Sequence, residues 1–494
     1  MSNPTRFSLL LNLKFCLLMT EIRKTIILIL SFGFSGIFLS SCKEKYSEGM
    51  IVFTQVAEKI TDINPVAGNF TRQNAQTRIV ALNPGSPDSP IKVLSEGFYS
   101  ACSPAISYDG ARMLFAAKQK QDYPWQIWKM DLKKSEIKQI TSLPENCIGP
   151  SFLPNGRLIF SKMALNDSTN TGNALYSCNA DGSDIRQVTF NPHSYSASTI
   201  LKDGRVLTIR RQLCPDSNEA LFMVLRPDGT KNELFYKGSE KFQPVSRGWE
   251  TTSGRIVFIE SDKESHESGK LISVSYNRPL HSYNDLSSGI EGNFISVYPL
   301  ISGKLLVSYR RSESDRYGLY EFDPENKRLG RAVYESKEYD VAEAVAIEQH
   351  NRQRKLPSEV DTGVKSGLIL CQDINFSGLI PAGDASALPK ATRIRIIGRD
   401  SSLGEIDVEK DGSFYLKVKA DTPFRIQALD EKGSVMGYPC GWIYLRQNER
   451  RGCVGCHEDP EIVPDNKVSL AVKKAPVNVP VHISKVVEKK VSLE

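Results

Sequence analysis

The chain has 494 residues, of which 24% are charged, and its formal net charge is only +6. Because this small excess of positive charge is spread along the chain, the composition does not indicate a nucleic-acid-binding protein. The mean hydropathy is −0.30, and only the N-terminal stretch is strongly apolar, which excludes a protein built mainly of membrane-spanning helices. The length suggests two or three domains.

The N-terminal segment has the pattern of an export signal. Arg23 and Lys24 precede an apolar run over 26–38, which is too short to span a bilayer comfortably. The run ends in Leu-Ser-Ser-Cys, which resembles the lipobox of bacterial lipoproteins. We therefore expect residues 1–41 to be a signal peptide and Cys42 to carry the lipid that anchors the mature protein in the cell envelope, at the outer membrane or facing the periplasm. An uncleaved anchor is the alternative.

A turn followed by a short apolar strand recurs along the next 300 or so residues with a period of about 48 residues. Each copy has Asp, Asn or Ser before a glycine that can adopt a positive φ, and further short strands follow it. Four short strands per unit are typical of a propeller blade. Six copies predict a six-bladed β-propeller over 42–350, resembling TolB-like propellers. The turn glycines are Gly49, Gly110, Gly156, Gly204, Gly254 and Gly303.

The first copy begins directly at Met50, with no strand before it. Its missing partner strand should come from elsewhere in the chain, and the alternating segment 340–347, which follows the sixth copy, is the natural donor. Closing the ring with strands from both ends would leave no exposed sheet edge.

A second, smaller all-β domain is expected after the propeller. Residues 351–366 are charged, lack a periodic pattern and contain a proline, so they are predicted to be a linker. Short alternating strands separated by turn residues then indicate a β-sandwich over 367–446. These strands are predicted at 367–370, 393–397, 413–418 and 424–429.

A CxxCH pentapeptide, Cys453 to His457, lies in the last predicted segment, 447–494. The thiols of Cys453 and Cys456 can add to the two vinyl groups of one haem, while His457 ligates the iron. A structural zinc site would need four ligands, and no second CxxC is present. A thioredoxin-like pair would need a βαβ context. We therefore predict one covalent haem c in this segment.

The second axial ligand of such a haem is left open by the sequence. His482 is the only histidine after the motif and is the favoured candidate, although an open sixth position is equally compatible with the pattern. His193, His281 and His350 are expected to be surface histidines. Met436 is another possible ligand, one that would raise the reduction potential.

Six further cysteines could form disulfides in an oxidising compartment. Two pairs are suggested by position, Cys102 with Cys147 in adjacent propeller units and Cys371 with Cys440 bracketing the small domain, but buried thiols are an equally good interpretation. The six are Cys102, Cys147, Cys178, Cys214, Cys371 and Cys440.

Aromatic residues just before the motif, Tyr438, Trp442 and Tyr444, could pack on a haem face or belong to an ordinary core. No Ser-His-Asp set, phosphate loop or paired-carboxylate motif stands out, so the sequence assigns no catalytic residue.

The whole arrangement resembles the hydrazine synthase alpha subunit-related family of c-type cytochrome lipoproteins. The resemblance is most specific from Asp411-Gly-Ser-Phe through Asp421-Thr-Pro-Phe to the segment Glu449–Glu458. It implies a haem at Cys453, Cys456 and His457. It does not imply hydrazine synthesis, because the hydrazine-forming subunit carries a further CxxCH and this chain has one.

From these features we expect an exported, lipid-anchored mono-haem cytochrome c that transfers electrons to or from a redox partner protein docked on the propeller. A first alternative is a haem-dependent oxidoreductase acting on a small nitrogenous or peroxide-type molecule. A second is a protein-binding propeller with an accessory haem. The contacts with the membrane would be made through the lipid anchor alone.

Overall fold

A computed structural model describes the chain at 46, 48–61, 76–85, 90–164, 172–213, 216–264, 269–376, 390–436, 440–455, 461 and 467–481. The regular elements of these residues are strands, apart from the short 3-10 helix η2 (Leu470–Lys473). The predicted all-β class is therefore confirmed. No helix in the described ranges is long and apolar enough to cross a bilayer. The strands belong to one compact unit, Tyr46–Leu132 with Glu136–Glu494.

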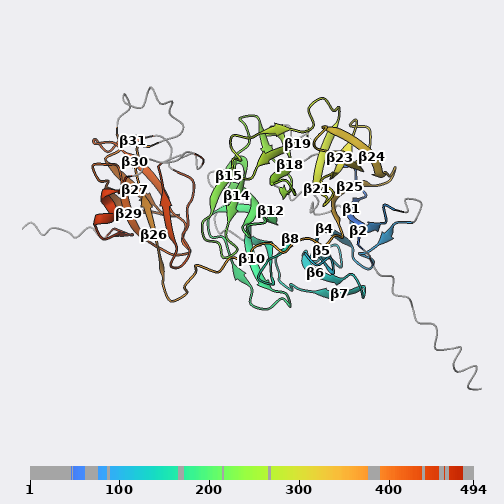
Figure 1. Ribbon diagram of the computed structural model, residues 1–494. Helices are drawn as coiled ribbons and strands as arrows, with labels where there is room; N and C mark the ends of the chain where they lie inside the picture. The colour runs from blue at the N-terminus through green and yellow to red at the C-terminus, as the bar shows by residue number, and fades with distance from the viewer. Residues whose placement is uncertain are drawn as a thin grey trace, which may run out of the picture. The chain divides into compact units, whose positions relative to one another are not determined.

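Six antiparallel sheets follow one another between Ile51 and Ala346 in the described ranges, and five of them are made of consecutive strands (Figure 1). The second and third sheets are β4 (Ser100–Ile106), β5 (Arg112–Lys118), β6 (Gln126–Asp131), β7 (Glu136–Gln139), then β8 (Cys147–Phe152), β9 (Arg157–Ala164), β10 (Gly172–Asn179), β11 (Arg186–Gln187). The fourth is β12 (His193–Ile200), β13 (Val206–Leu213), β14 (Asp216–Leu225), β15 (Glu233–Tyr236). The fifth and sixth are β16 (Phe242–Pro244), β17 (Trp249–Glu250), β18 (Arg255–Asp262), β19 (Gly269–Ser275), β20 (Asn284–Asp285), then β21 (Asn293–Pro299), β22 (Leu305–Arg310), β23 (Gly318–Asp323), β24 (Arg328–Tyr334).

The first sheet combines strands from both ends of this region, in the order β25-β1-β2-β3. Its members are β25 (Asp340–Ala346), β1 (Ile51–Val56), β2 (Thr77–Leu82) and β3 (Lys92–Val93). β25 runs antiparallel to β1, with Ile51 opposite Ala346 and Val56 opposite Asp340. The predicted donor strand therefore closes the propeller, because it covers the edge of β1 that would otherwise be exposed.

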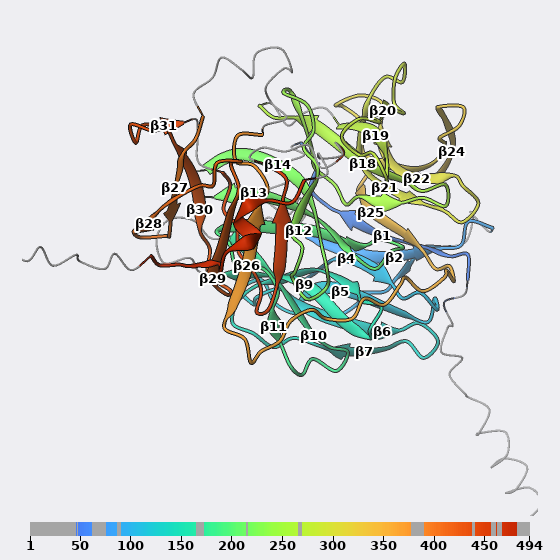
Figure 2. The ribbon, with the colours of Figure 1, turned by 60° about the vertical axis from the view of Figure 1, so that its left-hand side comes forward.

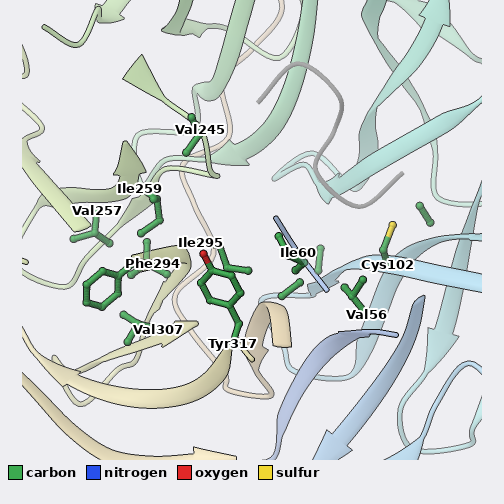
Figure 3. Close-up of a cluster of buried hydrophobic side chains, with 14 of the residues drawn as sticks. Val56, Ile60, Cys102, Val245, Val257, Ile259, Phe294, Ile295, Val307 and Tyr317 are labelled. Carbon is green, nitrogen blue, oxygen red and sulfur yellow. The ribbon is translucent and has the colours of Figure 1, made fainter. Parts of the chain in front are cut away.

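The propeller core lies between neighbouring sheets, where side chains from successive sheets pack together (Figure 3). Cys102, Cys147 and Cys178 belong to one such cluster as buried thiols, and no disulfide joins them. Burial raises the pKa of Cys147 to about 12 and that of Cys178 to about 11, so these thiols stay protonated. Of the two suggested disulfides, the one between Cys102 and Cys147 is thus not formed. Cys214 lies outside the described residues.

Residues 348–361, here called the strap, have no regular secondary structure but are bound along the propeller turns. The strap backbone donates from His350 to the carbonyl of Tyr108 at 3.0 Å and from Arg354 to that of Lys202 at 3.0 Å. Further along, the Glu359 amide donates to the Asp228 carboxylate at 2.7 Å. The predicted linker is therefore an ordered segment that crosses several blades.

Two further sheets form the second domain and pack face to face around one apolar core (Figure 2). The predicted sandwich strands appear at the expected places. One sheet has β32 (Arg450–Cys453), β26 (Ser366–Cys371), β29 (Phe414–Lys419) and β33 (Val477–Asn478); the other has β28 (Ser402–Asp407), β27 (Arg393–Ile397), β30 (Arg425–Leu429) and β31 (Val435–Met436). β32 and β33, from the predicted haem segment, are edge strands of this sandwich rather than an appended unit.

The repeated turn glycines have left-handed φ angles, including +90° at Gly204 and +78° at Gly254. Replacing either by alanine should cost about 1–2 kcal/mol of backbone strain. At Gly204 the added methyl would also lie 1.9 Å from the Arg354 carbonyl oxygen, whereas at Gly254 it would meet no atom within 4 Å. Gly204→Ala should therefore lower the free energy of unfolding in urea more than Gly254→Ala. It should also speed tryptic cleavage in the strap, and equal effects of both variants would contradict the strap contact.

Candidate functional site

The CxxCH motif begins at the end of an edge strand. β32 runs parallel to β26, which places Cys453 opposite Cys371. The backbone amide of Gln372 donates to the carbonyl of Cys453 at 2.9 Å, and that of Asp373 donates to Val454 at 3.1 Å. Cys453 is half-buried. The two other predicted residues, Cys456 and His457, lie outside the described residues.

The chain leaving β32 is pressed against the turn at 373–376. A Cβ atom added to Gly455 would lie 2.3 Å from the Phe376 carbonyl oxygen and 2.8 Å from the Phe376 ring. The turn itself is closed by a hydrogen bond from the Phe376 amide to the Asp373 carbonyl at 3.1 Å. Only glycine therefore fits between the two cysteines at position 455 without moving this turn.

The base of β32 is held by a buried carboxylate that the sequence analysis missed. Glu449 is fully buried. Its Oε1 accepts from the backbone amide of Lys231 at 2.9 Å and from Nε and Nη2 of Arg451 at 3.0 and 2.6 Å. Its Oε2 accepts from the amide of Arg446 at 2.8 Å. Because these charge-assisted bonds satisfy both oxygens, the buried charges of Glu449 and Arg451 are compensated.

Lys231 belongs to the turn between β14 and β15, so Glu449 ties the second domain to the fourth propeller sheet. Two neighbours of Glu449 bind the same turn. The Tyr444 hydroxyl donates to the Gly229 carbonyl at 3.0 Å, and Nε of Arg446 donates to the Asp228 carbonyl at 3.0 Å. Tyr444 is thus a junction residue, and its burial raises the pKa of its hydroxyl well above the ordinary value.

The other aromatic candidates have different surroundings. Trp442 is buried, with the Arg425 guanidinium 5.5 Å from the centre of its ring and its carbonyl accepting from Asn191 at 3.4 Å. It therefore also belongs to the junction with the propeller. Tyr438 lies outside the described residues.

The segment after the motif also returns to the propeller. The Glu461 carboxylate accepts from the backbone amide of Leu280 at 2.6 Å and lies 3.5 Å from Nε of Arg278. This turn connects β19 to β20 and carries the exposed His281 next to Leu280. The propeller therefore contacts described residues on both sides of the motif, and Glu461 binds the turn that carries His281.

For one of the remaining histidines, His193, the prediction of surface exposure is wrong. His193, predicted to be exposed, is 2% exposed, because the start of β12 is covered by the junction. Burial, with Arg210 nearby, holds the pKa of His193 well below its ordinary value, so the imidazole is neutral. His350 is exposed on the strap, as expected. His482 lies outside the described residues, and Met436 packs against the sandwich core.

In the described part of the chain, no three His, Cys, Asp or Glu side chains come together in a way that could hold a metal ion. The carboxylates of the propeller turns bind backbone amides instead. Asp203, for example, accepts from the amide of Arg205 at 2.9 Å. These aspartates therefore have a structural role in closing the turns.

Replacing Glu449 by glutamine should destabilise the protein strongly, because it leaves the buried Arg451 without its counter-charge. We expect a loss of about 3–5 kcal/mol in the free energy of unfolding measured in denaturant. Glu321→Gln is the matched control. Glu321 pairs with Lys304 and Arg331 at the surface, where such pairs contribute about 0–1 kcal/mol. Equal losses for the two variants would show that the Glu449 network does not support the fold.

Comparison with known proteins shows what this part of the chain is similar to. A family model described as the hydrazine synthase alpha subunit middle domain matches residues 341–458. The match runs from β25 through the strap and the sandwich, and it ends one residue after His457. The CxxCH motif is thus part of the matched middle domain rather than of a separate C-terminal segment.

Longer similarity extends over the propeller. Hydrazine synthase subunit alpha of Kuenenia stuttgartiensis is 22% identical over 74% of this chain, which spans 61% of that relative's length. The solved structure of hydrazine synthase from that organism superposes with a TM-score of 0.71 at 20% identity, covering 87% of this chain and 72% of the other. TolB from Acinetobacter baumannii gives a TM-score of 0.43 at 16% identity, covering 62% of this chain and 68% of its own. The chain is therefore related to the hydrazine synthase alpha subunit, whose middle-domain model matches residues 341–458.

Proposed function

We propose that this protein binds one haem c through thioether bonds to Cys453 and Cys456, with His457 as the proximal ligand of the iron. The donor set carries this proposal, since two thiols and an imidazole in CxxCH spacing suit this cofactor and no other common one. The structure of the described part is compatible with it. Cys453 lies half-buried at the end of a strand and packs against the sandwich core.

The haem would supply one-electron chemistry, and the protein's residues would fix its position. Glu449 and Arg451 hold the strand before the motif against the β14–β15 turn, and Glu461 holds the segment after it against the β19–β20 turn. These two attachments join described residues before and after the motif to the propeller. We propose that the protein transfers electrons through this haem to or from a partner protein that docks on the propeller.

A haem-dependent oxidoreductase is the second candidate, and the relationship to an enzyme subunit is the observation that favours it. Its substrate would be a small nitrogenous or peroxide-type molecule that reaches the iron. The two candidates differ in one structural feature, the occupancy of the sixth coordination position of the iron. Export and lipid attachment at Cys42 remain predictions, because Cys42 lies outside the described residues.

Covalent attachment is tested by intact-mass measurement and haem staining of protein produced in a host that matures c-type cytochromes. The wild type should carry the mass of one haem and stain after denaturation. Cys453→Ala and Cys456→Ala should each lose a thioether, and the double variant should carry no covalent haem. Cys440→Ala, a cysteine outside the motif, should stain like the wild type. A wild-type protein with unmodified mass would refute the proposal.

The sixth coordination position decides between the two candidates. For an electron carrier with His482 as the distal ligand, the reduced wild type should give a low-spin spectrum that carbon monoxide does not change. His482→Ala should then bind carbon monoxide, while His281→Ala should behave like the wild type. If His281→Ala instead opened the site, the ligand would come from the propeller. A wild-type haem that binds carbon monoxide would contradict electron transfer through a six-coordinate haem and favour the oxidoreductase.

A further inference from the structure

A cavity of about 80 Å³ lies on the propeller axis, apart from the CxxCH motif. Its wall is formed by the inner strands or adjoining residues of all six sheets, and Figure 3 labels three of the lining residues, Cys102, Val245 and Ile295. A water molecule needs roughly 10–15 Å³ on this measure, so the space accommodates a molecule of about five non-hydrogen atoms.

The inner strands are distorted where they line this cavity. β4, β8 and β12 each break their pairing register at the same level of the propeller. Ser103, Gly149 and Ala197 lie within these breaks and have φ angles of 58°, 59° and 54°. A left-handed φ costs a serine or an alanine about 1–2 kcal/mol, and such bulges commonly re-aim groups beside a functional site. The innermost strands of three successive blades therefore have irregular strand pairing at the cavity wall.

The cavity contains hydrogen-bond donors that the protein does not use. Arg247 lines it, and Nη1 of its guanidinium is buried without a partner among the described residues. Ser161, which lines the cavity from the neighbouring β9, is 1% exposed, and its hydroxyl also has no partner there. Leaving a buried donor unpaired costs about 1–3 kcal/mol, so two in one cavity indicate a bound acceptor.

The acceptor is not supplied by the other charged residue in the wall. The Glu343 carboxylate accepts from the backbone amide of Ser103 at 2.9 Å and from the Ser103 hydroxyl at 3.4 Å. It forms no ion pair with Arg247 among the described salt bridges, although the two charges are near enough to interact. Glu343 is therefore held by the bulge of β4, and Nη1 of Arg247, which lines the cavity, has no partner among the described residues.

We propose that the axial cavity binds a small carboxylate, no larger than a simple amino acid, with its carboxylate on Arg247 and Ser161. A multiply charged oxyanion is disfavoured because Glu343 faces the same space. An organic body is favoured because apolar side chains form much of the wall. They are Ile148, Ile209, Val245, Ile295 and Val297. Glu343 lies where it can receive the ammonium group of an amino acid.

The test is a titration of the full-length protein with 13C-labelled acetate or glycine. Binding is measured from the NMR line width of the labelled ligand. Both should bind saturably, and methylammonium, which lacks a carboxylate, should not. Arg247→Met should weaken binding at least about tenfold, and Ser161→Ala about threefold or more. Arg186→Met is the control. The Arg186 side chain is 67% exposed, so its replacement should leave the affinity unchanged.

Further variants identify the ligand class and guard against misfolding. Glu343→Gln should weaken glycine but not acetate if the natural ligand is an amino acid, and neither if it is a simple carboxylate. Ser161→Ala removes one oxygen atom, so it keeps the test valid if Arg247→Met fails to fold. Two results would overturn the proposal: no saturable binding of either carboxylate by folded wild type, which would mean a cavity filled by water, or undiminished affinity in Ser161→Ala and folded Arg247→Met.

Discussion

The buried carboxylate of Glu449 is the interaction on which the arrangement of this protein depends. An ionised carboxylate is costly to remove from water unless hydrogen bonds and an opposite charge replace the solvent. Here Arg451 supplies the charge, and two backbone amides complete the shell, one of them from Lys231 in the propeller. Because that amide is fixed in a turn, the same bonds that make the charge tolerable also fix β32 against the propeller. The position of Cys453 follows from this constraint.

The family match begins at 341, inside the strand that closes the propeller, and this boundary has a physical reason. β25 belongs to the first sheet by its hydrogen bonds, but it leads directly into the strap and the sandwich. The strap is bound to the turns it crosses, so its course is set by the propeller surface. Closing strand, strap and sandwich are therefore one mechanically continuous segment, which explains why a similarity centred on the second domain includes a propeller strand.

Local chemistry determines what the sequence could predict. Gly204 and the equivalent glycines predicted turns because a positive φ favours glycine. The strand that follows Met50 lacked a preceding partner, which led to the prediction that β25 pairs with it. The CxxCH spacing is likewise a local signal. Glu449 was missed because its partner Lys231 is 218 residues away in sequence. His193 was misplaced for a similar reason, since its surroundings include Trp442 and Arg425 from the second domain. Contacts between side chains so far apart in sequence produce no periodic pattern that a sequence analysis can detect.

Two largely enclosed arginines in one chain separate a structural role from a binding role. Arg451 donates two hydrogen bonds to Glu449, so the positive charge of Arg451 is compensated within the fold. Arg247 has Glu343 in its neighbourhood, yet that carboxylate accepts from Ser103, and Nη1 of the guanidinium has no partner among the described residues. A fold under no other demand would pair such charges directly, because a buried unpaired charge is strongly destabilising. Here the Ser103 amide and hydroxyl donate to Glu343 instead, and Arg247 and Glu343 both line the cavity without an ion pair among the described salt bridges, so both charges can contact a third group.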